Sequence, residues 1–269
     1  TLEAGLRADY LRQFGVEWLP RVSAMYRLSP KFTTRLGGGF GYKSPTIFTE
    51  DAERKYFRHI LPVDERVTHN ERSIGGNWDI NYRTTIGNVS LTLNQLFFYT
   101  RLNRPLVMTP GSNGNLSFFN STGHLDTEGM ETNVRLIYHD FKLFLGYTYT
   151  DANTHFGTKE WMPLTARHRL NNVLMYEKDG KWKIGIEAYY FSRQQLSDGS
   201  PGQPYWITGL MIEKIWQQVS LFINFENITD TRQTRFGNIY TGSIDNPVFR
   251  DIYAPLDGFV INGGVKLKL

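Results

Sequence analysis

The sequence of 269 residues contains no cysteine, so neither a disulfide framework nor a thiolate metal site can form. It also lacks a long apolar run, and its mean hydropathy is -0.40, which argues against a transmembrane helix. Neither charge is in strong excess, because 30 Lys and Arg against 26 Asp and Glu leave a net charge of only +4. We read this small excess as ordinary surface charge and expect no nucleic-acid partner.

The beginning of the chain carries no signal-peptide pattern. The opening TLEAGLRADY already alternates like a β-strand. We therefore expect either a mature sequence or a piece of a longer one.

Aromatic residues are abundant, at 14% of the chain, and they gather on alternating positions. In FKLFLGYTYT, residues Phe141, Leu145 and Tyr149 share one parity, while Gly146 and Thr148 occupy the other. A period of two indicates a strand with two different faces. An apolar face that ends in tyrosines would meet a core in a soluble sandwich, or lipid in an outer-membrane barrel.

The same alternation predicts about twelve strands of roughly ten residues, a length that crosses a bilayer at a tilt. The predicted strands lie near residues 2–8, 16–28, 32–42, 74–82, 89–99, 130–138, 141–149, 164–177, 182–190, 206–212, 219–225 and 259–269. Apart from Arg72 and Lys214 at strand ends, the apolar faces carry no charge, and Gln95 is an unusual polar member. A charge facing hydrocarbon would cost about 2–4 kcal/mol at mid-depth.

The connections between these strands alternate in length. Short connections fall at Ser29–Lys31, Ile86–Asn88, His139–Asp140, Lys178–Gly180 and Ile215–Gln218, and long ones at 43–71, 101–128, 152–163, 192–204 and 229–258. Outer-membrane barrels join their strands by short periplasmic turns and long extracellular loops. The pattern favours a transmembrane antiparallel β-barrel over a sandwich. An even strand number places both chain ends on the short-turn side.

Several stretches resemble the C-terminal barrel of TonB-dependent outer-membrane receptors. They are GLRADY near the start, RLGGGFGYKSPTIF (35–48), PLTARHRLNNVLMYE (163–177), FINFENITDTRQTRFG (222–237) and APLDGFVINGGVKLKL (254–269). The resemblance implies an all-β fold in which residues 1–269 form the C-terminal half of a plugged barrel of twenty-two strands. The plug domain and the TonB box would lie outside this sequence. Family members commonly end in an aromatic residue, whereas this chain ends in Leu269.

The resemblance also implies a function and a set of partners. An outer-membrane receptor of a Gram-negative bacterium would capture a scarce nutrient, most simply a ferric siderophore, haem or a cobalamin-type chelate, and import it with energy from TonB. Its partners would be outer-membrane lipid, the plug domain, TonB and the small chelate. Import of an oligosaccharide or a peptide is the alternative within the family. A passive porin of twelve strands is the alternative from another class.

The sequence offers little support for an enzyme. The six histidines are scattered without helical metal-ligand spacing, at His59, His69, His124, His139, His155 and His168. The Ser, His and Asp residues follow no nucleophile-elbow pattern. The glycine-rich 37–41 lies within a strand with no helix after it, so it does not predict a phosphate site. We expect no enzyme, no cofactor and no metal site, and we expect these glycines to make room for the plug.

Ligand contacts are expected on or beside the long loops, where Arg and Tyr suit anionic, aromatic chelates. The candidates are Tyr56, Phe57, Arg58, His59, Trp161, Arg193, Tyr205, Arg235 and Tyr240. GYKSPTIF resembles the box that precedes a histidine-bearing loop in haem receptors, with His59 and His69 following, but solvated loop histidines are the simpler interpretation. Interior charges such as Arg35, Glu131, Arg135 and Glu187 are expected to line the lumen, and Asn227 and Asp230 to close a turn.

Overall fold

The computed structural model describes residues 1–54, 57–111, 113–156 and 160–268. Twelve strands form the main path of one sheet: β1 (Leu2–Leu11), β2 (Gly15–Ser29), β3 (Phe32–Lys43), β4 (Glu71–Ile86), β5 (Val89–Asn103), β8 (His124–Tyr138), β9 (Phe141–Thr154), β11 (His168–Lys178), β12 (Trp182–Phe191), β13 (Tyr205–Ile215), β14 (Val219–Glu226) and β17 (Val260–Leu267). The two-residue β10 (Glu160–Trp161) pairs with β9 as a thirteenth strand. The twelve strands predicted from alternation are these twelve.

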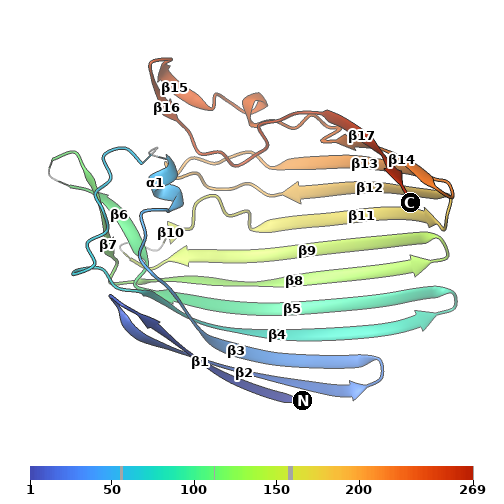
Figure 1. The fold of residues 1–269 in the computed structure, drawn as a ribbon, viewed down its shortest axis with the longest axis horizontal. Coiled ribbons are helices and arrows are strands. Elements are labelled where there is room, and N and C mark those ends of the chain that lie inside the picture. The colour runs from blue at the N-terminus through green and yellow to red at the C-terminus, as the bar shows by residue number, and fades with distance from the viewer. Residues whose placement is uncertain (55–56, 112, 157–159, 269) are drawn as a thin grey trace.

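Every neighbouring pair in the sheet is antiparallel and follows chain order (Figure 1). Within the described residues β1 and β17 pair only with β2 and β14, so the sheet has two open edges and is not a closed barrel. The strand pairing therefore does not give the closed twelve-stranded barrel that a passive porin would require.

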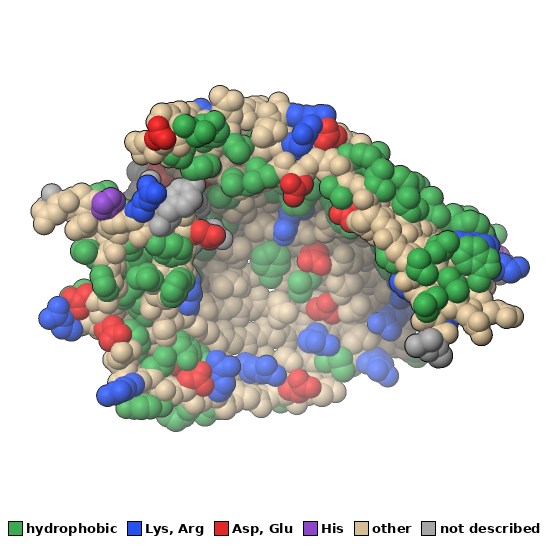
Figure 2. Space-filling model, turned by 45° about the horizontal axis from the view of Figure 1, so that its top comes forward, with side chains coloured by type: hydrophobic (Ala, Val, Ile, Leu, Met, Phe, Trp, Pro, Cys, Tyr) green, Lys and Arg blue, Asp and Glu red, His purple; other side chains and the backbone are tan. Residues whose placement is uncertain are grey.

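The two faces of the sheet differ in chemistry as the alternation predicts. The outer face is apolar and exposed, with Leu6 at 66% and Leu36 at 63% exposure. On β9, Leu145 is exposed on this face, whereas Gly146 is buried between Asn133 and Asn171 of the adjacent strands. Figure 2 looks into the hollow of the curved sheet, where acidic and basic side chains line the inner face. The polar parity therefore lines the hollow.

Lys214 and Arg72 are two charged residues that share the parity of the apolar face. Each lies near a strand end and contacts a partner. Lys214 Nζ lies 4.3 Å from the ring centroid of Trp182 and 5.8 Å from that of Trp216. Arg72 Nε donates to Glu17 Oε2 at 3.0 Å. An ammonium group held over indole rings is typical of a belt where an apolar surface meets water.

Turns and loops separate to opposite ends of the sheet, as expected (Figure 1). Both termini lie at the turn end, where the Thr1 ammonium donates to Met25 O and Lys268 N to Gln218 O. One connection departs from the length pattern, because the turn 12–14 between β1 and β2 lies at the loop end and is short. Leu269 lies outside the described residues.

The long connections contain small elements of their own. These are α1 (Glu50–Arg54), the hairpin of β6 (Leu106–Pro110) and β7 (Leu116–Asn120), the 3₁₀ turn η1 (Gln233–Arg235), and the hairpin of β15 (Tyr240–Ser243) and β16 (Asn246–Phe249). No helix among the described residues has the length and apolar character that a membrane span requires. Strand β11 begins at His168 rather than at residue 164, because Pro163 supplies no donor and Leu164 has a positive φ of 60°.

Candidate ligand site at the loop end of the sheet

A recess opens on the inner face at the loop end of four consecutive strands. Its volume is about 480 Å³, and its lining includes Thr150 of β9, Arg169 of β11, Phe191 of β12, Gln194, Tyr205 of β13 and Tyr253. The segment 252–254 of the last long connection forms part of its wall. We call this cavity the loop-end recess. It joins one cation to several aromatic rings in a hollow that faces the long loops.

Aromatic packing holds the wall of the recess together. Tyr205 is only 8% exposed, and its ring stacks on Phe191 at 4.9 Å between centroids. The Tyr205 hydroxyl donates to the backbone carbonyl of Tyr253 at 2.7 Å. Phe236 stacks on Tyr253 at 6.4 Å and also lies 6.5 Å from the Tyr205 ring. Tyr205, one of the residues expected to contact ligand, is therefore buried against the loop that carries Tyr253.

Buried Gln233 fixes the same loop from within. Its Nε2 donates to Asp251 O at 2.7 Å, and its Oε1 accepts from the backbone N–H of Tyr253 at 2.7 Å and of Ala254 at 3.1 Å. One side-chain amide thus satisfies three backbone groups that no strand pairing reaches. The recess wall is held by specific hydrogen bonds.

Arg169 is the cation of the recess, and the sequence reasoning missed it. Its side chain is exposed on the inner face, and no ion pair with it occurs among the described residues. The signal was present, because Arg169 lies opposite in parity to Leu170 and Leu174 near the loop end of its strand. An unpaired guanidinium beside aromatic rings can bind an anion with two hydrogen bonds.

The predicted residues of the first long connection lie on a different part of the loop end. Phe57, Arg58 and His59 are exposed, with Phe57 edge-on to Phe48 at 5.8 Å. The backbone N–H of Leu116 donates to His59 O at 2.7 Å, which aligns this segment with β7. Tyr56 lies outside the described residues.

The two histidines considered for haem contact opposite ends of β7. His59 meets Leu116, and His69 N donates to Asn120 Oδ1 at 2.7 Å. Four residues of strand separate these anchor points by about 13 Å. The fold therefore holds the two histidine-bearing segments at opposite ends of one short strand.

The other predicted residues that the structure describes do not line the recess. Trp161 is 40% exposed, and the Arg167 guanidinium carbon lies 3.0 Å from its ring centroid. Arg193 is exposed, and Tyr240 packs against Phe249 in the β15–β16 hairpin at 6.1 Å. Arg235 forms an ion pair with Asp230. The eight predicted residues that the structure describes therefore belong to several segments and do not form one cluster.

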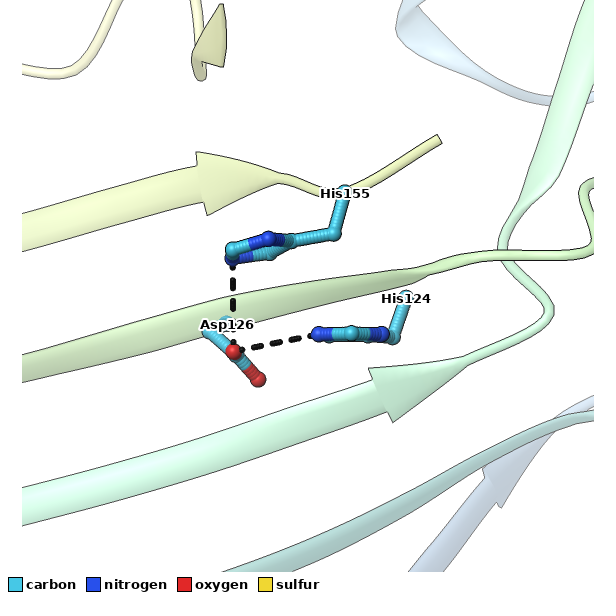
Figure 3. Close-up of side chains that lie close together, drawn as sticks. All are labelled: His124, Asp126 and His155. Atoms are coloured by element: carbon cyan, nitrogen blue, oxygen red, sulfur yellow. Dashed lines mark ion pairs between the residues drawn. The ribbon is translucent and has the colours of Figure 1, made fainter. Parts of the chain in front are cut away.

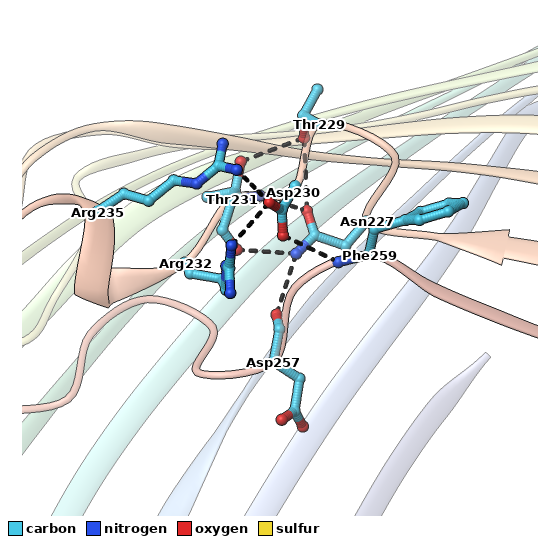
Figure 4. Close-up of polar contacts among 8 residues, drawn as sticks. All are labelled: Asn227, Thr229, Asp230, Thr231, Arg232, Arg235, Asp257 and Phe259. Carbon is cyan, nitrogen blue, oxygen red and sulfur yellow. Dashed lines mark hydrogen bonds and ion pairs between the residues drawn. The ribbon is translucent and has the colours of Figure 1, made fainter.

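The ENITD sequence forms the turn that ends β14, as expected (Figure 4). Asn227 and Asp230 have φ of 50° and 51°, a conformation that Asn and Asp tolerate. Asn227 Nδ2 donates to Thr231 O at 2.8 Å and to Asp257 O at 3.1 Å. These bonds join the two ends of the last long connection.

Asp230 supplies the charge at the same turn. Its Oδ1 accepts from Phe259 N at 3.1 Å, and its Oδ2 pairs with Arg232 at 2.9 Å and with Arg235. Desolvation alone would raise the pKa of Asp230. The Phe259 N–H and the two guanidinium groups outweigh it, so the pKa lies below its ordinary value.

A second recess of about 570 Å³ lies on the inner face nearer β1. It is lined by Arg21, Arg35, Gly37, Gly39, Gly75 and Asn77. A Cβ added at Gly39 would come within 3.0 Å of Arg21 Cβ and 3.2 Å of Pro20 O, and one at Gly75 within 2.9 Å of Thr100 Oγ1. The glycine run is therefore explained partly by close packing of strands and partly by an open inner wall.

Comparison of the whole chain with solved structures gives matches to siderophore receptors and to an iron transporter. A mutant of the ferric enterobactin receptor PfeA from Pseudomonas aeruginosa has a TM-score of 0.71 at 16% identity, over 98% of this chain and 42% of that one. The siderophore receptor PirA from Pseudomonas aeruginosa gives 0.66 at 18%, over 99% and 43%. The FrpB iron transporter from Neisseria meningitidis gives 0.66 at 12%, over 93% and 39%. At these identities the likeness shows the fold, and the chain spans about two fifths of these proteins.

Sequence comparisons give the family. No curated protein matches the sequence. A family model described as TonB dependent receptor-like, beta-barrel matches residues 1–228, which include eleven of the twelve main strands, and β17 beyond them pairs with β14 along its whole length. Proteins of this family are transport receptors of the Gram-negative outer membrane and not enzymes. The chain belongs to the TonB-dependent receptor β-barrel family.

Proposed function

We propose that residues 1–269 form the C-terminal part of a TonB-dependent receptor that imports a ferric siderophore. The observation that carries this proposal is the loop-end recess, in which Arg169 and the rings of Phe191 and Tyr253 face the hollow of the sheet. Ferric siderophore complexes of the catecholate type are anionic and aromatic. A guanidinium supplies charge and hydrogen bonds to such a ligand, and aromatic rings supply stacking surface.

In this proposal the sheet continues beyond both open edges. The exposed backbone of β1 and β17 would be costly in lipid, so further strands of the same receptor must pair with them. A total of twenty-two strands would make these twelve the C-terminal half. The inner face would then contact a plug domain, with the glycine-lined recess as one contact surface. TonB would act through the N-terminal region.

The predicted loop residues serve as a first contact layer in the same scheme. Trp161, Arg193, Arg235 and Tyr240 would contribute from the connections that follow β9, β12 and β14, and Tyr56, Phe57, Arg58 and His59 from the first long connection. Tyr205 supports the recess wall. The runner-up is import of an oligosaccharide or a peptide, and a neutral ligand of either kind would use Arg169 for hydrogen bonds but not for its charge.

Ligand binding by the purified full receptor tests the proposal. Intrinsic tryptophan fluorescence would be titrated with a ferric catecholate, a ferric hydroxamate, haem and a maltooligosaccharide. We expect saturable quenching by the ferric catecholate at the lowest concentration. Saturation by the oligosaccharide alone, with no response to any iron chelate, would contradict the proposal.

A further inference from the structure

Two histidines that are far apart in the sequence meet at the loop end of β8 and β9 (Figure 3). His124 is the first residue of β8, and His155 directly follows β9. The His155 backbone N–H donates to His124 O at 2.8 Å, which extends the pairing of the two strands by one step. The two imidazole rings stack at 4.4 Å between centroids, with an interplanar angle of 17°.

A carboxylate completes the cluster. Asp126 lies two residues after His124, hence on the same face of β8. Its Oδ2 is 3.3 Å from Nε2 of His124 and 3.4 Å from Nε2 of His155. All three side chains are half-buried, and their potential ligand atoms lie within 4.8 Å of one another.

The separations of 3.3 and 3.4 Å between Asp126 Oδ2 and the two Nε2 atoms fit a metal ion, which the stacked rings would bind by tilting until both Nε2 lone pairs point at it. Bonds of about 2.0–2.2 Å arranged as a tetrahedron place neighbouring ligand atoms about 3.3 Å apart. We propose that His124, Asp126 and His155 bind one divalent transition-metal ion of the Zn²⁺ type. The two imidazoles select against Mg²⁺ and Ca²⁺, which prefer all-oxygen sites. Three protein ligands leave the fourth position for water.

The surroundings of Asp126 orient it as a ligand. Its Oδ1 accepts from Arg101 Nε and from the Tyr99 hydroxyl, both at 2.9 Å, and its Oδ2 accepts from Arg101 at 3.1 Å. Hydrogen bonds of this kind fix ligating carboxylates in metal sites. Arg101 also offsets the charge of Asp126. The site therefore holds its ion less tightly than a site whose carboxylate has no guanidinium beside it.

The position of the cluster indicates what the ion does. Tyr99 belongs to the exposed apolar face of β5, so the cluster lies on the outer side of the sheet and away from the loop-end recess. The ion would bind the first residue of the connection 155–167 to β8. That connection carries Trp161 and Arg167. The metal ion therefore holds the connection 155–167 against β8 and is separate from any imported iron.

Metal analysis of the purified full receptor tests this inference. After equilibration with Zn²⁺ and removal of free ion, we expect one Zn²⁺ that is lost in His124→Ala and in His155→Ala. His139→Ala, at a short turn, is the matched control and should keep it. Co²⁺ in the wild type should give the intense visible bands of a tetrahedral site.

A direct measurement covers the case in which a variant fails to assemble. Anomalous scattering from crystals of the wild-type receptor soaked in Zn²⁺ should show a peak within bonding distance of Asp126 Oδ2 and of both Nε2 atoms. Absence of that peak at full exposure to Zn²⁺ would overturn the inference, as would unchanged Zn²⁺ content in both histidine variants. Limited proteolysis should cleave 155–167 more slowly with Zn²⁺ than with Mg²⁺.

Discussion

The Thr132 hydroxyl donates a hydrogen bond to Gln95 Oε1 at 2.6 Å, directly across the pairing of β5 and β8. Both residues lie on the apolar face of the sheet, on which the sequence places Gln95 as an unusual polar residue. In hydrocarbon an unpaired amide or hydroxyl costs several kcal/mol, because no water is present to replace the partner. The pair therefore explains how one glutamine is tolerated there.

A double-mutant cycle on this pair is our first prediction. Thr132→Val leaves the Gln95 amide without its donor and should lower the free energy of unfolding by about 1–3 kcal/mol. Gln95→Leu combined with Thr132→Val removes both polar groups and should cost less than Thr132→Val alone. Urea unfolding of the full receptor in lipid vesicles measures both. Additive single effects would show that the two side chains do not depend on each other.

The second prediction concerns the two faces of β9. Leu145→Arg places a cation in hydrocarbon at a cost of about 2–4 kcal/mol, so less folded, heat-modifiable receptor should reach the outer membrane. Thr148→Arg is the matched control, because Thr148 lies on the inner face opposite Glu131. We expect its assembly to be nearly unchanged. Equal loss in both variants would contradict the assignment of the faces.

The third prediction concerns the pH dependence of the last long connection. The pKa of Asp230 is lowered from an ordinary value of 3.8, so its contribution is complete above that value and is lost as the pH falls below it, toward the folded-state pKa. The Phe259 amide should therefore stay protected from hydrogen exchange at pH 5 and above. Asp230→Asn should lose part of that protection at pH 5 and above. Asp245→Asn, in an exposed hairpin turn, should keep it. An unprotected Phe259 amide in the wild type at pH 7 would disprove the network.

The fourth prediction concerns ligand charge. Hydrogen bonds to a charged group contribute about 1.5–3 kcal/mol, so Arg169→Gln should weaken binding of an anionic ferric chelate about ten-fold or more. Arg12→Gln, in the exposed turn between β1 and β2, is the matched control and should bind normally. Fluorescence titration of the full receptor measures both. Unchanged affinity in Arg169→Gln would remove the recess from the binding site.

Alternation predicted the strands well because it is a local property. The outward direction of Leu145 and the inward direction of Gly146 follow from their parity alone, and the structure agrees. The loop elements were not predicted, because β7 (Leu116–Asn120) and the β15–β16 hairpin are short and lie within connections. Their pairing depends on turn geometry more than on an apolar face.

Contacts between distant residues needed the strand register. His124 and His155 meet because β8 pairs with β9 in a register that aligns Leu125 with Thr154. Tyr205 was expected to contact ligand because it begins a strand after a long loop, but burial against Tyr253 depends on how that loop folds back. The sequence therefore predicted the loop end as the place of ligand contact, and the fold shows which of the candidate residues lie close together there.

Energised uptake tests the central claim most directly. Cells that produce the full receptor would be supplied with a radioactive ferric siderophore, with TonB present or deleted. We predict rapid accumulation of iron that requires both the receptor and TonB, with Arg169→Gln reducing uptake at low chelate concentration and Arg12→Gln leaving it unchanged. Uptake that continues at the same rate without TonB, or the absence of receptor-dependent uptake for every iron chelate offered, would contradict the account.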